Sequence, residues 1–237
     1  MRIIFAFCLA LTILVPTFTK ADLNSLDRAE LNRVIEDFIR NNPKVVRDTL
    51  IKLAAREEAE RKQTGLAMVR DDRGDPVMGN PNGKITLYEF SDYNCGYCKR
   101  VFEPIQQLLR ENPDVRLVIK EFPILNQSSL VAAKAAIAAE MQNKFSAYHI
   151  AMMTYRGQIN SDVVMRLAAQ AGADENQLKI DMESPKTAAI IRRTRDAAAA
   201  LEVNGTPALV LGNILIPGAI GLDELNKLIV QERNKQG

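Results

Sequence analysis

The stretch EFSDYNCGYC, residues 89–98, joins two different sequence patterns. The run ITLYEF at 85–90 is rich in β-branched and aromatic side chains, which predicts a buried strand. Across 96–111, apolar side chains recur at helical spacing, which predicts a helix. The two cysteines of the stretch, Cys95 and Cys98, therefore lie where a strand ends and a helix begins.

The N-terminus of a helix presents unpaired backbone N–H groups and the positive end of the helix dipole. Both favour a thiolate over a thiol at Cys95, and cysteines in such positions have pKa values of roughly 3.5 to 7.5. We expect Cys95 to be the nucleophile. Cys98, one turn into the helix, is then the resolving thiol that breaks a mixed disulfide.

Three other uses of the cysteine pair stay open from the residues alone. A structural disulfide across two residues would remove little unfolded-state entropy, because the closed loop is so short. A soft metal such as copper(I) could be held by the two thiolates. A zinc site would need the lone histidine, His149, and a further ligand, yet the helical pattern around His149 is typical of a packed or surface side chain. We expect no resident metal and no cofactor.

Further elements follow in a clear order. Residues 71–84 are turn-rich and mark the entrance to a domain. A second strand at 115–122 completes a β-α-β unit with parallel strands. No convincing strand occurs between 123 and 204. Helical patterns lie near 128–142, 144–155, 161–171, 175–182 and 186–201. Two apolar runs, 208–211 and 214–216, are separated by Gly-Asn, a hairpin signal, and a helix at 222–231 follows. This order predicts an α/β domain with a helical insertion.

The sequence NGTP, residues 204–207, directly precedes the first of these late strands. Proline has no N–H to donate to a sheet, so the backbone of Thr206 is left to pair with another group. An X-Pro bond such as Thr206–Pro207 also adopts the cis form more readily than other peptide bonds. On the residues alone the segment is a turn.

Ahead of the domain, residues 24–63 predict two helices. Asn42-Pro43 is an N-cap followed by proline at the first helical position. The apolar side chains of the first helix are Leu31, Ile35, Phe38 and Ile39. Beyond Leu53 the pattern becomes polar, and residues 54–65 are expected to form a solvated helix with almost nothing to bury. Such short helices cannot build a core alone, so their apolar faces meet either the main domain or, as we favour, other copies of the chain.

The first 21 residues have the pattern of a cleaved export signal. Arg2 precedes an apolar run at 3–16, and Ala21 is a small residue suited to cleavage. The run is shorter than the roughly 20 residues needed to span a bilayer. Cys8 would be removed with this segment, leaving Cys95 and Cys98 in an oxidising compartment.

Composition excludes several classes of function. The chain has 237 residues, of which 47% are hydrophobic, and this excludes an intrinsically disordered protein. Its 31 basic and 29 acidic side chains contain no long single-sign run, so nothing predicts binding to nucleic acid.

Together these features resemble the DsbA family of the thioredoxin superfamily, which comprises exported thiol-disulfide oxidoreductases. The stretch 89–98 matches the active-site segment of the family, and GTPA at 205–208 matches its cis-proline loop, so that the resemblance covers 75–235. It implies a thioredoxin fold, a cis Pro207 that faces the cysteines, and a Thr206 backbone that is offered to substrate. It also implies that the cysteines cycle between dithiol and disulfide.

The resemblance extends to Glu89, which matches a buried acid found beneath the cysteine pair. A desolvated carboxyl has a raised pKa and can accept a proton when Cys98 becomes a thiolate. Lys120, near the end of the second strand, is the expected buried partner of Glu89.

Two departures from the oxidase members refine the resemblance. Gly96-Tyr97 stands between the cysteines in place of Pro-His, so no imidazolium lowers the Cys95 pKa further, and a milder oxidant is expected. The arm at 22–70 is similar to the oligomerising segment of suppressor-of-copper-sensitivity C (ScsC) proteins, which trimerise and isomerise disulfides. Gly-Tyr and a threonine before the cis proline also recur in dimeric isomerases of the DsbC type.

The sequence thus predicts a thioredoxin fold with a helical insertion and an N-terminal helical arm. The expected parts are a signal peptide at 1–21, an oligomerisation arm and linker at 22–70 and a catalytic domain at 71–237, with a thioredoxin core at 75–125 and 186–237 and an insertion at 126–185. The expected enzyme is a periplasmic disulfide isomerase or reductase, most simply a homotrimer. Its expected partners are exported cysteine-containing proteins and a DsbD-like membrane thiol reductase. A dithiol oxidase and a copper(I)-binding protein are the alternatives.

Overall fold

The computed structural model describes residues 28–236. The expected signal peptide at 1–21 lies outside these residues. The chain divides into two compact units, one that ends at Ala54 and one that runs from Ala55 to the C-terminus.

In the first unit, helix α1 (Arg28–Asn41) ends just before helix α2 (Pro43–Arg70) begins. Asn42 lies between them, and its side chain donates a hydrogen bond to the Phe38 carbonyl at 2.8 Å. No residue of α1 is buried. The exposed large apolar side chains of this unit are Leu31, Val34, Ile35, Phe38, Ile39, Val45, Val46, Leu50, Ile51 and Leu53.

The second unit contains a five-stranded sheet in the order β1-β3-β2-β4-β5. The strands are β1 (Val77–Gly79), β2 (Ile85–Ser91), β3 (Val115–Glu121), β4 (Ala208–Leu211) and β5 (Ile214–Pro217). The predicted parallel pairing of β2 with β3 is confirmed, and so is the hairpin of β4 and β5. Strand β1 is not predicted from the turn-rich segment, because an edge strand of three residues is too short to show a period.

The helices of this unit occur where the sequence predicts them. They are α3 (Gly96–Glu111), α4 (Gln127–Met141), α5 (Phe145–Thr154), α6 (Ser161–Gln170), α7 (Glu175–Met182), α8 (Pro185–Ala200) and α9 (Leu222–Gln236). Four of them begin at a side-chain cap, in which Asn126, Asn160, Asp174 or Ser184 accepts a hydrogen bond from the backbone N–H three residues later. These caps satisfy donors that a helix start would otherwise leave unpaired.

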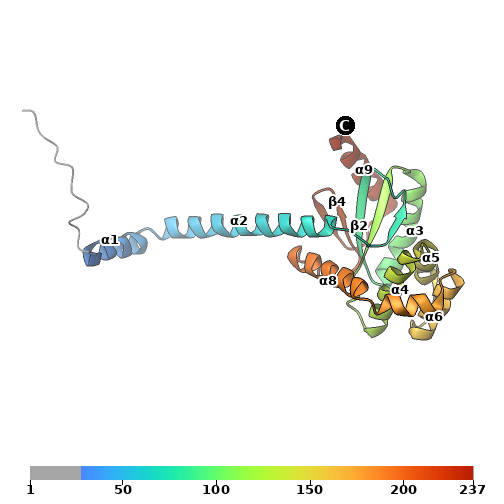
Figure 1. Ribbon diagram of the computed structural model, residues 1–237. Coiled ribbons are helices and arrows are strands. Elements are labelled where there is room, and N and C mark those ends of the chain that lie inside the picture. Colours follow the sequence, from blue (N-terminus) through green and yellow to red (C-terminus); the bar gives the residue numbers. More distant parts are fainter. Residues whose placement is uncertain (1–27, 237) are drawn as a thin grey trace, which may run out of the picture. The chain divides into compact units, whose positions relative to one another are not determined.

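The sheet has an apolar core on each face. One core contains side chains of β2, α3 and α9 together with the inserted helices α4 to α7. The other contains side chains of β2, β3 and β4, the C-terminal part of α8, and the end of α2. Figure 1 shows α8 on one side of the strands and α3 on the other. This is the α/β thioredoxin fold with a helical insertion, as predicted.

Residues 54–64 are exposed, apart from the half-buried Arg61, as expected for a solvated helix, but the helix continues to Arg70 and its last turns are partly buried. Leu66 and Val69 are buried in the second core, and Gly65 lies against α8. A Cβ at Gly65 would come within 2.7 Å of the Leu201 side chain and 3.2 Å of the Ala200 backbone, so a larger residue would require Leu201 to move. Leu66 and Val69 follow a charged run and lie one turn apart. Two buried positions are too few to reveal a helical period in the sequence.

Lys120 does not pair with Glu89, and this expectation is wrong. Because β2 and β3 are parallel and in register, Lys120 lies beside Phe90, whereas Glu89 lies beside Ile119. Neighbouring residues of a strand point to opposite faces of a sheet, so the two charges lie on opposite faces. Lys120 instead contacts the Asp75 carboxylate at 2.6 Å, and both side chains are fully buried.

This buried pair yields a test of stability. Asp75→Asn leaves the Lys120 ammonium buried without its acid and also removes the 3.0 Å contact between Asp75 and Arg193. We expect the free energy of unfolding, measured with urea, to fall by about 3–5 kcal/mol. The control is Glu183→Gln, which breaks the exposed pair with Lys134 and should cost less than about 1 kcal/mol. Equal losses in the two variants would contradict the prediction.

Candidate active site

The cysteines lie at the junction of β2 and α3. Cys95 is the N-cap residue of α3, and Cys98 lies in its first turn. Both are buried free thiols, with Cys95 6% exposed and Cys98 fully covered. Their place is the one predicted from the change of sequence pattern at residues 89–98.

The loop before Cys95 is held by Asp92, which is itself buried. One oxygen of its carboxylate accepts a hydrogen bond from the Asn94 N–H, and the other accepts from Ile124 and Leu125. The Asp92 carbonyl accepts from the Cys95 N–H at 2.9 Å. The loop is thereby tied to the segment after β3, which fixes the position of the cysteine. Asp92 stands within the stretch 89–98, but the sequence pattern there does not predict this role.

The surroundings of Cys95 favour its thiolate. The Cys98 thiol donates a hydrogen bond to the Cys95 sulfur, and this lowers the pKa of Cys95 to about 5. Burial opposes the shift, while the nearby Thr206 hydroxyl and the backbone N–H groups of Cys98 and Tyr97 support it. The value lies in the range expected for a helix N-terminus, but the largest contribution comes from the second cysteine.

Thr206 and Pro207 face Cys95 from the loop before β4. The Thr206–Pro207 bond is cis, as the family resemblance implies. The Thr206 carbonyl lies 3.1 Å from the Cys95 sulfur, which joins two residues 111 positions apart in the chain. Among the described residues, the Thr206 N–H has no backbone partner. It is therefore free to pair with an incoming extended chain.

The protonation of Cys98 depends on Glu89. The hydrogen bond from the Cys98 thiol to Cys95 raises the pKa of Cys98, and burial and the negative charge of Glu89 raise it further. Burial raises the pKa of Glu89 to about 7, and the charge of Cys95 adds to this. Oε1 of Glu89 has no hydrogen-bond partner among the described residues. Glu89 is thus a buried acid that can exchange a proton near neutral pH, as predicted, although without the predicted lysine.

A second buried acid, Glu121, was missed. It lies beside Ser91 at the end of β3, on the same face of the sheet as Glu89. The Tyr93 hydroxyl donates a hydrogen bond to Glu121 at 3.1 Å and lies 2.9 Å from Nδ1 of His149. Burial raises the pKa of Glu121 well above its usual range and lowers that of His149 to about 3. His149 is therefore a packed, neutral side chain. The period of two along β3 was the signal that could have revealed Glu121.

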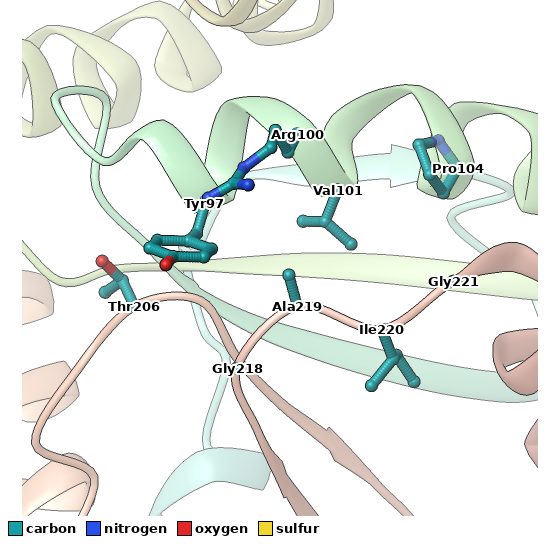
Figure 2. A pocket seen from close by; sticks show the side chains of 9 residues that line it. All are labelled: Tyr97, Arg100, Val101, Pro104, Thr206, Gly218, Ala219, Ile220 and Gly221. Carbon is teal, nitrogen blue, oxygen red and sulfur yellow. The ribbon is translucent and has the colours of Figure 1, made fainter.

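A groove of about 570 Å³ lies between α3 and the segment that follows β5 (Figure 2). Tyr97, Arg100, Val101 and Pro104 of α3 line it along one side. Thr206 and the segment 218–221 that follows β5 line the other. The groove therefore adjoins both the sequence between the two cysteines and the residue before the cis proline.

Within residues 28–236, no three or more His, Cys, Asp or Glu side chains are grouped so that they could hold a metal ion.

The comparisons with known proteins agree with this geometry. Residues 86–230 match the family model of the DSBA-like thioredoxin domain. This chain belongs to that family and carries the CxxC cysteine pair at Cys95 and Cys98. Membership implies thiol-disulfide oxidoreductase chemistry at that pair.

Solved structures show the same fold. A thioredoxin-like oxidoreductase from Silicibacter pomeroyi DSS-3 is 41% identical, with a TM-score of 0.68 over 70% of this chain and 96% of its own. The thiol-disulfide exchange protein alpha-DsbA2 from Wolbachia pipientis is 27% identical, with a TM-score of 0.67 over 74% and 97% of the two chains. ScsC from Proteus mirabilis, at 24% identity, shares the fold with a TM-score of 0.67 over 89% of this chain and 100% of its own.

A curated relative, the Na(+)/H(+) antiporter NhaA 1 of Mycolicibacterium gilvum, is 30% identical over 152 residues. This chain covers only 25% of the length of that antiporter. None of the helices in residues 28–236 is long and apolar enough to cross a membrane. The match therefore concerns about a quarter of the antiporter's length.

The low pKa of Cys95 can be measured in the reduced chain lacking residues 1–21, by thiolate absorbance against pH. We expect a midpoint of about 5 that is absent in Cys95→Ser. In Cys98→Ala the midpoint should rise, because the thiol that donates to Cys95 is lost. A midpoint near 9 in the intact reduced pair would contradict this account, since 9.0 is the ordinary value for a thiol.

The raised pKa of Glu89 predicts how stability depends on pH. The pKa of Glu89 is about 7 in the folded chain and 4.5 ordinarily, so the folded chain holds this proton more tightly than the unfolded chain does. The resulting contribution to the free energy of unfolding is complete below about pH 4.5 and is lost as pH rises through about 7. We expect Glu89→Gln to remove a decline of about 2 kcal/mol in unfolding free energy between about pH 5 and pH 8. The control Glu57→Gln alters an exposed side chain and should leave the decline unchanged. An unchanged decline in Glu89→Gln would contradict the assignment.

Proposed function

We propose that this oxidoreductase is an oligomeric disulfide isomerase or reductase of the ScsC type, exported to the periplasm by removal of residues 1–21. In this proposal residues 22–70 form the oligomerisation arm and 71–237 the catalytic domain. The observation that carries the proposal is the apolar surface of the arm, which the chain leaves exposed.

The apolar side chains of α1 form one continuous face. Leu31, Ile35 and Phe38 recur at spacings of four and three residues, and Val34 and Ile39 lie between and beyond them on the same side. Their exposed fractions range from 45% to 59%. A short helix with such a face is marginal in water by itself, whereas packing against further copies would bury the face. The occupant proposed for it is therefore the same face of other copies, most simply in a homotrimer.

The proposed reaction begins with the Cys95 thiolate. Its sulfur bonds to one sulfur of a substrate disulfide, that disulfide breaks, and the second substrate sulfur leaves as a thiolate. In isomerisation this substrate thiolate breaks another disulfide of the same chain, and a substrate thiolate freed in that way attacks the mixed disulfide, forms a new substrate disulfide and releases the Cys95 thiolate. In reduction Cys98 loses its proton, with Glu89 as acceptor, and attacks the Cys95 sulfur. The Cys95–Cys98 disulfide forms, the mixed disulfide breaks, and the substrate sulfur leaves as a thiolate that takes up a proton. The Thr206 backbone, positioned by Pro207, would pair with the substrate strand.

An isomerase must hold Cys95 reduced in a compartment that favours disulfides. A membrane thiol reductase of the DsbD type is the proposed electron donor, and exported proteins with wrong disulfides are the proposed substrates. Several active sites joined by one oligomer would raise the effective concentration of Cys95 around a bound, misfolded chain.

One observation favours a second function, dithiol oxidase. The low Cys95 pKa stabilises the reduced pair, and stabilisation of the reduced form makes the disulfide a better oxidant. The absence of histidine between the cysteines weakens this effect, so the isomerase is preferred.

The test uses the full mature chain with the paired changes Ile35→Glu and Phe38→Glu, which place charges on the apolar face of α1. We expect a monomer in sedimentation and a loss of about tenfold or more in refolding of a scrambled disulfide protein. Oxidation of a reduced protein should persist. The control is Arg33→Glu, on the opposite side of the same helix. Full isomerase activity in a monomeric double variant would remove the arm from the mechanism.

A deletion version of this experiment should end at Ala54. Removal of the whole expected arm to residue 70 would also remove Leu66 and Val69 from the core of the catalytic unit. A loss of activity would then report on unfolding as much as on oligomerisation.

A further inference from the structure

Arg100 is a cation without an acidic partner at the edge of the groove beside Cys95. Across residues 28–236, no carboxylate forms a salt bridge with it. On the same helix, Arg110 contacts Glu103 at 3.1 Å. Glu103, one turn beyond Arg100, is therefore already engaged. The groove itself is lined by no acidic residue.

The guanidinium of Arg100 is held in place by an aromatic ring. It lies 3.9 Å from the centre of the Tyr97 ring, and Figure 2 shows it stacked above that ring. Stacking uses the flat face of the guanidinium and leaves its N–H edge free. That edge is the group that binds a carboxylate through two parallel hydrogen bonds.

The position of Arg100 relative to Cys95 gives this charge a role. Thr206 lines the groove, and its carbonyl lies 3.1 Å from the Cys95 sulfur. Tyr97, which carries the stacked guanidinium, lies between the two cysteines. Consider a substrate polypeptide that is joined to Cys95 through its own cysteine and paired with the Thr206 backbone. The side chains that neighbour the substrate cysteine would then lie in the groove.

We propose that this groove selects substrate segments that carry an aspartate or glutamate close to the reactive cysteine, with Arg100 as the specificity-determining residue. An apolar side chain of the same segment would lie against Val101, Pro104 and Ile220. The inference rests on the proposed action of Cys95 on polypeptide disulfides and adds the chemical class of the substrate segment.

The test measures the first exchange step with peptides. Each short extended peptide contains one cysteine, linked by a disulfide to a coloured aromatic thiol. The Cys95 thiolate attacks the peptide sulfur, the original disulfide breaks, and the aromatic thiolate leaves and is recorded. The peptides differ only in having Glu, Gln or Lys at one position beside the cysteine, and the position is varied across the series.

We expect the Glu peptide to react about fivefold faster than the Gln peptide at low ionic strength, and the Lys peptide to react more slowly than both. Added salt should reduce the differences. Arg100→Gln should bring the ratio of Glu to Gln rates close to one, and Arg100→Glu should reverse the order. Arg100→Lys, which keeps the charge but loses the paired donors, should give an intermediate ratio.

The ratio of rates separates recognition from other effects of the substitution. A change in the Cys95 pKa or in folding alters the rates of all peptides together and leaves the ratio unchanged. Arg110→Gln is the matched control, because it removes an arginine from the same helix outside the groove and should keep the ratio of the unaltered chain.

Three outcomes would overturn the inference, and they differ in whether they also refute the proposed function. Equal rates for the Glu, Gln and Lys peptides at every position, or a ratio that survives in Arg100→Gln, would refute the acidic preference and leave the proposed function standing. No reaction of Cys95 with any peptide would refute both.

Discussion

The hydrogen bond from the Cys98 thiol to the Cys95 sulfur, made at the start of α3, is the interaction on which the rest of the site depends. It keeps one sulfur ready to be an anion and the other protonated, so that the two identical side chains have different chemistry. The helix start supplies the supporting N–H groups, and Asp92 fixes the loop that delivers Cys95 to them. The nucleophile is therefore created by the second cysteine together with the helix start, without a charged residue between the cysteines.

The sheet separates two kinds of buried charge. On the face toward α3 and the inserted helices, Glu89 and Glu121 are buried without a cation, and both have raised pKa values. On the opposite face, Lys120 and Asp75 form a buried ion pair. Alternation along β2 and β3 keeps these groups apart. A cation beside Glu89 would lower its pKa and make it a poorer proton acceptor for Cys98 near neutral pH, so this separation suits thiol exchange.

Helix α2 belongs to both compact units. Its first turns carry exposed apolar side chains such as Leu50 and Ile51, and its last turns bury Leu66 and Val69 beside the sheet. The charged residues between these two segments form few contacts; the pair of Arg56 with Glu60 is exposed. The same helix thus contributes apolar side chains to the exposed surface of the first unit and to the core of the second.

Local spacing in the sequence determined the strands β2 and β3, every helix from α3 to α9, and the place of Cys95 and Cys98 at a helix start, because these follow from periods of two and 3.6 and from caps. The family resemblance added the cis Pro207. Only the tertiary structure decided which groups meet across the fold: Lys120 with Asp75, Tyr93 with Glu121 and His149, and Arg100 with a groove that lacks any acid. The periodicity of the sequence indicates on which face of a strand or helix a residue lies. Its contact partner depends on which distant strand or helix packs against that face, and local sequence does not encode that packing.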